Sequence, residues 1–302
     1  MRNRIFTGIQ HAVRFHGMRT MLLAILCFLT GSAYAQSDSD SWVTVHCDEP
    51  GQLGERFIQA TGSAEACLQV THLKVTGRLG GADRSAFEHM MNNVMYLDLG
   101  EVEAEDNSDS FYTSYNKRNL RSIIMPSGLT TYLSLEGCEN IESFVGPTAP
   151  VEVGYRSFFG CKWLTSIDLP ESVRIISNQA FCNCENLERV TMSPKVKLFD
   201  SDCFNGCKSL TDLTIPDSLE EISFAALYAT ALNHITLPEG CKVIKNSAFA
   251  NNTTLTTVVM PREIEIGTNN YYNSWFKGCT SLINVTLPQN LTILYDGMFQ
   301  NR

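Results

Sequence analysis

A block that recurs about every 23 residues is the feature of this sequence that most restricts its fold. Six aligned segments read FFGCKWLTSIDLP, FCNCENLERVTMSP, FNGCKSLTDLTIP, LYATALNHITLP, FANNTTLTTVVMP and FKGCTSLINVTLP. The anchor residues of these segments and of the copy that follows them are Phe159, Phe181, Phe204, Leu227, Phe249, Phe276 and Phe299, with spacings of 22, 23, 23, 22, 27 and 23 residues. Weaker copies come earlier, as NLRSIIMP, NIESFVGP, HLKVTG and MYLDLG, so the repeat covers most of the chain.

Each unit holds an L-x-x-I-x-L stretch, whose alternation predicts a half-buried strand that the following proline ends. A short strand in every unit cannot pair with itself, but stacked units pair their strands and bury one continuous core, which is a solenoid. The apolar residues that close the strands predict ten rungs, at Val75, Leu99, Met125, Gly146, Leu169, Met192, Ile215, Leu237, Met260 and Leu287. We expect an α/β-type, right-handed stack with a parallel β-sheet on one face. Residues 36 to about 70 fall outside the period and form an N-terminal cap, with a short helix around GQLGERFIQA.

The first 35 residues predict a secretory signal. They contain four arginines and no acidic residue, followed by the apolar run MLLAILCFL and by GSAYA, which ends in an Ala-x-Ala cleavage site after Ala35. Lipid attachment at Cys27 is the alternative, but the bulky Leu26 before it disfavours this. The expected organisation is a signal peptide at 1–35, a cap with degenerate first rungs at 36–118, and a repeat domain at 119–302.

Charge narrows the class of partner. Without the four arginines of the signal, 19 basic residues (23 minus 4) face 32 acidic ones, a formal net charge of −13. Such a surface repels the phosphates of nucleic acid. No later segment approaches the roughly twenty apolar residues of a membrane helix. We therefore expect an exported protein with no membrane span and no nucleic-acid partner.

The cysteines follow the repeat. The fourth position of the unit holds a cysteine in five rungs, at Cys138, Cys161, Cys184, Cys207 and Cys279. Stacked rungs point these side chains in the same direction, which predicts a buried column of thiols rather than disulfides. Thr230 and Asn252 replace cysteine in the same register, which a metal array would not tolerate. Two pairs outside the column stay open as disulfides, Cys182 with Cys203 and Cys47 with Cys67.

Two kinds of candidate ligand-binding residue follow from the repeat. The outward positions of the strands provide Arg189, Thr191, Asp212, Thr214, His234 and Thr236. Two insertions, EDNSDSFYTSYNKRN and IGTNNYYNSWF, provide Phe111, Tyr112, Tyr115, Tyr271, Tyr272 and Trp275. Tyrosine and tryptophan among Asn and Ser are typical of binding loops, although the same rings can instead fold back over the rung. The threonines also have a plain explanation in β-propensity.

The unit F-x-G-C-x-x-L-x-x-I-x-L-P resembles the BspA-type (treponemal-type) bacterial leucine-rich repeat, strongly from about Leu120 to Phe299. The segments VTVHCDEPGQLGERF and VMYLDLG resemble the N-terminal region of such proteins in Bacteroidetes. The resemblance implies a secreted or cell-surface protein, adhesive in some members, without catalytic residues.

On this basis we expect a non-catalytic binding module without a cofactor or metal. Its partner would be a host extracellular protein, a mucin-type glycan or another cell-surface protein. A scaffold role in the cell envelope is the alternative, and a carbohydrate-handling enzyme is a more distant one. Because an uncapped last rung exposes unpaired backbone, end-to-end self-association is also open.

Overall fold

The computed structural model describes residues 41–106, 109–114, 117–265, 274–294 and 297–300, and it divides into two compact units. The predicted solenoid is confirmed. A strand lies at or just before each of the ten strand-closing residues, and every strand pair in the described residues is parallel. The predicted signal peptide lies outside the described residues.

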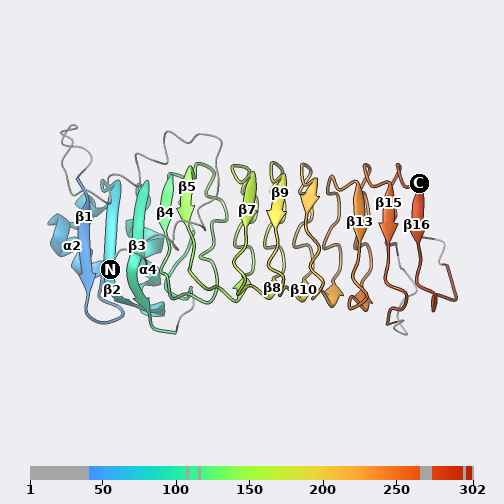
Figure 1. The fold of residues 1–302 in the computed structure, drawn as a ribbon. Coiled ribbons are helices and arrows are strands. Elements are labelled where there is room, and N and C mark those ends of the chain that lie inside the picture. The colour runs from blue at the N-terminus through green and yellow to red at the C-terminus, as the bar shows by residue number, and fades with distance from the viewer. Residues whose placement is uncertain (1–40, 107–108, 115–116, 266–273, 295–296, 301–302) are drawn as a thin grey trace, which may run out of the picture. The chain divides into compact units, whose positions relative to one another are not determined.

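The first unit contains the described residues up to 129 together with 138–147. Its sheet has the order β1-β2-β3-β4-β5 (Figure 1), formed by Val43–Cys47, His72–Leu79, Tyr96–Ala104, Ser122–Ile124 and Ser143–Val145. The helices are α2 (Leu53–Thr61), α3 (Ala64–Cys67) and α4 (Arg84–Met90), with a 3-10 turn at Gly81–Asp83. Helix α2 confirms the helix expected in the cap.

The second unit contains 130–137 and the described residues from 148 onward. Its front sheet consists of two three-stranded pieces with the orders β11-β9-β7 and β13-β15-β16. These strands are β7 (Ser166–Asp168), β9 (Arg189–Thr191), β11 (Asp212–Leu213), β13 (His234–Thr236), β15 (Thr257–Val259) and β16 (Asn284–Thr286).

A second parallel sheet, which the sequence did not predict, forms the back of the second unit. Its order is β14-β12-β10-β8-β6, from Val243–Ile244, Glu221–Ile222, Leu198–Phe199, Ile175–Ile176 and Glu152–Val153. Each of these strands has two residues, the second pointing into the core. The sequence between one proline and the next anchor therefore also adds its backbone to a ladder.

The anchors stack as a column of rings between the two sheets. Phe158, Phe181 and Phe204 lie face to face, with centroids 5.1 and 5.3 Å apart and planes within 3° and 2° of parallel. The anchor of the first of these rungs is Phe158, which is fully buried, so the prediction of Phe159 was wrong by one residue. Phe159 is half-buried, and the Arg156 guanidinium lies 3.9 Å above its ring. The spacing to Phe181 thereby becomes 23 residues, like its neighbours.

The cysteine column is also buried, and three of its thiols make the same hydrogen bond to the preceding rung. The Sγ atoms of Cys184, Cys207 and Cys279 donate to the anchor carbonyl of the preceding rung, at 2.9, 3.1 and 3.1 Å. Asn252 makes the equivalent bond from Nδ2 to the Leu227 carbonyl oxygen, at 2.8 Å. A small hydrogen-bond donor is therefore what the fourth position requires. Outside the column, Cys47, Cys67, Cys182 and Cys203 are separate buried thiols.

Every complete rung of the second unit turns two corners through left-handed backbone. One corner falls two residues before the anchor and the other two residues after it, at positions that include Gln179, Asn183 and Gly206, with φ of 56°, 60° and 75°. Glycine and asparagine suit this region because a Cβ atom is crowded there. Two alanines nevertheless occupy it, Ala225 at φ 51° and Ala229 at φ 52°.

Replacing Ala229 with glycine is expected to raise the free energy of unfolding by about 0.5–1 kcal/mol, since it removes a crowded Cβ from a left-handed residue. Urea unfolding at neutral pH measures this difference. Ala231→Gly, at a nearby residue without positive φ, is the matched control and is expected to lower stability slightly. Equal losses in both variants would show that the corner carries no strain.

Candidate functional site

The front face of the second unit is the surface formed by the outward side chains of its front sheet. It consists of Ser166, Asp168, Arg189, Thr191, Asp212, Thr214, His234, Thr236, Thr257, Val259, Asn284 and Thr286. These residues are half-buried or exposed, whereas the residues between them on β7, β9, β13 and β15, such as Val190 and Val258, are buried, and Leu213 and Val285 are half-buried. The predicted alternation is confirmed, and the six predicted face residues lie on this one surface.

Arg189 is held at the centre of the first piece of this face. Its Nη1 donates to Asp168 Oδ1 at 2.8 Å and to Thr191 Oγ1 at 2.6 Å. Across the sheet, Arg189 is the register partner of Asp212 on β11. The guanidinium therefore lies in an acidic surrounding, with its orientation set by two side chains. A partner that binds here would contact the Arg189 guanidinium, which is held in place between the carboxylates of Asp168 and Asp212.

His234 lies on the second piece of the face. Its Nε2 shares a hydrogen bond of 2.8 Å with Thr236 Oγ1 on the same strand. Among the described residues, no backbone pairing joins β11 to β13, so Asp212 and His234 are not cross-strand partners. The unit between them is one residue shorter than its neighbour. The leucine comes two residues after the fourth position in this unit, at Thr230 and Leu232, but three residues after it in the preceding unit, at Cys207 and Leu210. The interruption of the ladder thus coincides with the shortened unit.

The insertions expected as aromatic binding loops behave differently where they are described. Phe111, Tyr112 and Trp275 are 0%, 3% and 0% exposed, so their prediction as exposed loop aromatics was wrong. The first two pack against Phe87 of α4, with ring centroids 5.8 and 5.5 Å apart. Trp275 donates from Nε1 to the Ile244 carbonyl oxygen at 3.3 Å. These rings fold back to fill the core. Tyr115, Tyr271 and Tyr272 lie outside the described residues.

A buried lysine, which the sequence analysis did not single out, lies near the first insertion. Lys117 is 1% exposed, and its Nζ donates to the Phe87 carbonyl oxygen. Burial lowers the pKa of Lys117 to about 8, an effect that nearby Cys138 and Glu88 partly oppose. Burial also raises the pKa of the Cys138 thiol to about 12. These groups support the core of the first unit rather than a surface for ligands.

A row of aromatic side chains crosses the outward face of the first unit's sheet. Trp42 contacts His72 edge to face, with centroids 5.4 Å apart. His72 stacks on Tyr96 at 4.5 Å, with planes 13° from parallel. We call Trp42, His72 and Tyr96 the aromatic row. The sequence analysis missed it, although aligning THLKV with MYLDL places His72 and Tyr96 at the same repeat position.

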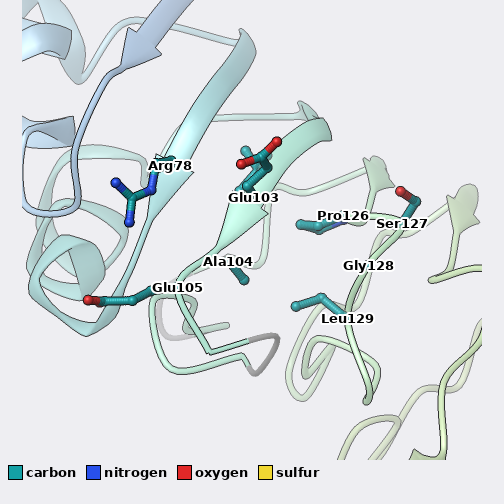
Figure 2. A pocket seen from close by; sticks show the side chains of 9 residues that line it. Arg78, Glu103, Ala104, Glu105, Pro126, Ser127, Gly128 and Leu129 are labelled. Atoms are coloured by element: carbon teal, nitrogen blue, oxygen red, sulfur yellow. The ribbon is translucent and has the colours of Figure 1, made fainter.

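The first unit also contains a pocket of about 440 Å³ near the carboxyl ends of β2, β3 and β4 (Figure 2). It is lined by Arg78, Val102, Glu103, Ala104, Glu105, Pro126, Ser127, Gly128 and Leu129. Arg78 is engaged by Glu49 at 2.7 Å. The remaining lining is a mixture of two carboxylates, the Ser127 hydroxyl group and small apolar groups, without a histidine or cysteine. This composition does not provide a serine paired with a histidine base.

Metal-ligand clusters and membrane-spanning helices are both absent from the part of the chain that the structure describes. Within it, no group of three or more His, Cys, Asp or Glu side chains is arranged to hold a metal ion. In the same residues, no helix has the length and apolar character needed to cross a bilayer.

The repeats of this chain match the model of a known protein family. A family model described as "BspA type Leucine rich repeat region" matches in six copies, over residues 65–164, 110–217, 134–256 and 261–302, which is more than half of the chain. Among proteins with curated descriptions, none matches.

Several solved structures are similar to this chain. A leucine-rich repeat protein from Bacteroides ovatus is 30% identical over 60% of this chain and 43% of its own, with a TM-score of 0.48. The leucine-rich repeat protein of T. pallidum is 26% identical over 59% of this chain and 76% of its own, with a TM-score of 0.44. A leucine-rich cell surface protein from Faecalibacterium prausnitzii is 16% identical over 80% and 78%, with a TM-score of 0.36. This chain thus spans less than half the length of the B. ovatus protein.

Proposed function

Because the chain belongs to the BspA-type leucine-rich repeat family, we propose that it is an exported, non-catalytic binding module that adheres to an extracellular protein through the front face. The repeat family supports a repeat-based protein-interaction module in general. Export is supported by the basic leader, the apolar run and the Ala-x-Ala site of residues 1–35.

The observation that carries this proposal is the construction of the front face. Its outward residues stand on a backbone fixed by parallel ladders, and most of the side chains between them are buried in the core. Arg189 is already oriented by Asp168 and Thr191, so a partner would lose little side-chain entropy in binding it. Arginine is also among the residues most often dominant in protein interfaces.

The test is a charge reversal at this position. Arg189→Glu is expected to weaken binding of the protein, with its signal removed, to its extracellular partner by about tenfold or more. The partner is first identified by pull-down from a panel of extracellular matrix proteins and mucin, and affinities are then measured by surface plasmon resonance. Arg174→Glu is the matched control, since Arg174 is exposed just before β8 on the back sheet and carries the same charge change.

Loss of binding in Arg189→Glu alone supports the front face. Equal loss in both variants would point to overall charge, and unchanged binding in both would remove the front face from the proposal. Deleting Thr268–Asn273 separately tests Tyr271 and Tyr272, which lie outside the described residues. A pull-down without any captured partner would favour a scaffold role in the envelope.

A further inference from the structure

The aromatic row is one end of a longer line of side chains on the outward face of β1–β5. His72 is the register partner of Tyr96, Tyr96 of Ser122, and Ser122 of Ser143. Trp42 precedes β1 and is 40% exposed. Three rings followed by two hydroxyl groups therefore lie on successive strands, with the change from large to small side chains between β3 and β4.

The stacking geometry decides which part of Tyr96 a ligand can reach. Because His72 and Tyr96 are neighbours across the sheet and nearly parallel, their ring faces point along the line rather than out of the sheet. One face of Tyr96 is covered by His72. The other looks toward Ser122, whose side chain is too small to cover a phenol ring. We call the space bounded by this ring face and by the floor of Ser122 and Ser143 the serine step.

The floor of the serine step is polar and connected. Ser143 Oγ donates to Ser122 Oγ at 3.0 Å, and both serines are half-buried. Two linked hydroxyl groups keep further donor and acceptor capacity toward a ligand. Beside them on the same face lie Ile124 and Val145, of which Val145 is 43% exposed. A ligand in the serine step would thus contact a ring face, hydroxyl groups and a small apolar edge.

The charged groups near the serine step are compensated. Lys74 Nζ lies 2.7 Å from Glu101 Oε1 and 3.7 Å from Asp98 Oδ2. Arg121 Nη1 lies 2.7 Å from Glu142 Oε1, and these two residues directly precede Ser122 and Ser143. These groups carry two positive and three negative charges, and both cations are already paired, so an anion is disfavoured. Each carboxylate also has a cation beside it, so an arginine side chain would gain little, and a ligand without net charge is favoured.

We propose that the serine step binds a neutral hexose unit of a glycan, with the sugar ring stacked on the free face of Tyr96 and its hydroxyl groups bonded to Ser122 and Ser143. A sugar ring has an apolar face that suits an aromatic ring and a rim of hydroxyl groups that suits serine. The Arg121–Glu142 pair provides further donors and acceptors at one end. This site is separate in residues from the front face and goes beyond the function proposed above.

Titration of the protein, with its signal removed, against maltohexaose, cellohexaose, laminarihexaose and mannohexaose tests this proposal. Binding is followed by isothermal calorimetry and by saturation-transfer NMR. Tyr96→Ala removes the ring, and Ser122→Tyr fills the space with a ring that continues the stack. Both are expected to weaken binding of the preferred oligosaccharide about tenfold or more. Tyr155→Ala, at a 63% exposed tyrosine of the second unit, is the matched control and should bind like the wild type.

Ser122→Tyr keeps the test decisive even where Tyr96→Ala folds poorly, because an added aromatic cross-strand neighbour supports the sheet. The proposal is overturned if none of the four oligosaccharides binds at about 10 mM. It is also overturned if binding survives in Ser122→Tyr. Sedimentation that shows wild-type dimers and a monomeric Ser122→Tyr would instead assign this face to a second copy of the chain, and would equally overturn it.

Discussion

In the presence of a reductant, raising the pH above about 9 is expected to unfold this protein steeply, because its buried thiols stay protonated in the folded state. Burial is the largest cause that raises the pKa of Cys47, Cys182 and Cys279 to about 11 and that of Cys138 and Cys241 to about 12. The pKa values of Cys184, Cys203 and Cys207 are also raised well above the ordinary value, with burial again the largest cause. Unfolded thiols ionise near 9.0, the ordinary value.

The sign follows from proton binding. Between about pH 9 and 11 the unfolded chain holds fewer protons than the folded chain, so the free energy of unfolding falls as pH rises. Each thiol contributes up to about 1.4 kcal/mol per pH unit, which sets an upper limit of about 11 kcal/mol per pH unit for the eight together. Lys117 opposes one of them, because its lowered pKa favours folding as pH rises above about 8. The net slope is comparable to the whole stability of a domain.

Urea unfolding at half-unit steps between pH 7.5 and about 10.5 measures this slope. Cys207→Ala is expected to be less stable at pH 7.5 but to reduce the slope by about 1.4 kcal/mol per pH unit. Val190→Ala, which truncates an equally buried side chain without a titrating group, should lower stability and leave the slope unchanged. A wild-type stability that stays constant from pH 8 to about 10 would contradict the expectation.

Asn252→Ala is expected to lower the free energy of unfolding by about 3–5 kcal/mol, because it leaves several buried polar groups without partners. Asn252 is 0% exposed, and its Oδ1 accepts from the Thr230 backbone nitrogen at 2.6 Å and from Thr230 Oγ1 at 2.7 Å. Its Nδ2 donates to the carbonyl oxygens of Leu227 and Phe249 at 2.8 and 2.9 Å. The side chain thus connects the short rung to the next one.

Asn252→Cys separates the two halves of this role. A thiol can donate to the Leu227 carbonyl as Cys207 does to that of Phe181, but it offers Thr230 a poor acceptor, so about half of the loss is expected. The control is Asn186→Ala, whose exposed amide donates to the Lys162 carbonyl oxygen, and it should cost less than about 1 kcal/mol. Urea unfolding of the three variants compares them. An Asn252→Ala variant as stable as Asn186→Ala would contradict the assignment.

Much of the fold follows from the period, because a strand ended by proline every 23 residues leaves few arrangements other than a stack. The back sheet was not predictable in the same way. Its strands, such as Ile175–Ile176, have two residues each, and two residues show no alternation. The anchor at Phe158 was misplaced because two phenylalanines are adjacent and periodicity alone tolerates a shift of one residue.

The front face was predictable from alternation, since its outward residues occupy every second position of the strands that the repeat predicts. The burial of Phe111 and Tyr112 was not, because it depends on Phe87, which comes from helix α4 between two degenerate copies of the repeat. The aromatic row was overlooked for a different reason. Its rungs are degenerate copies, and only the register between β2 and β3 shows that His72 and Tyr96 are stacked.

The interrupted ladder between β11 and β13 has a consequence for the front face, the surface proposed to bind a partner. The back sheet continues from β6 through β10 and β12 to β14 without interruption, while the front sheet is divided at the shortened unit. The front sheet of the second unit thus consists of two pieces, whereas a single continuous back sheet runs behind them. Under the proposed function, a ligand longer than three strands would therefore have to fit two separately paired pieces of sheet, so its affinity would depend on both pieces.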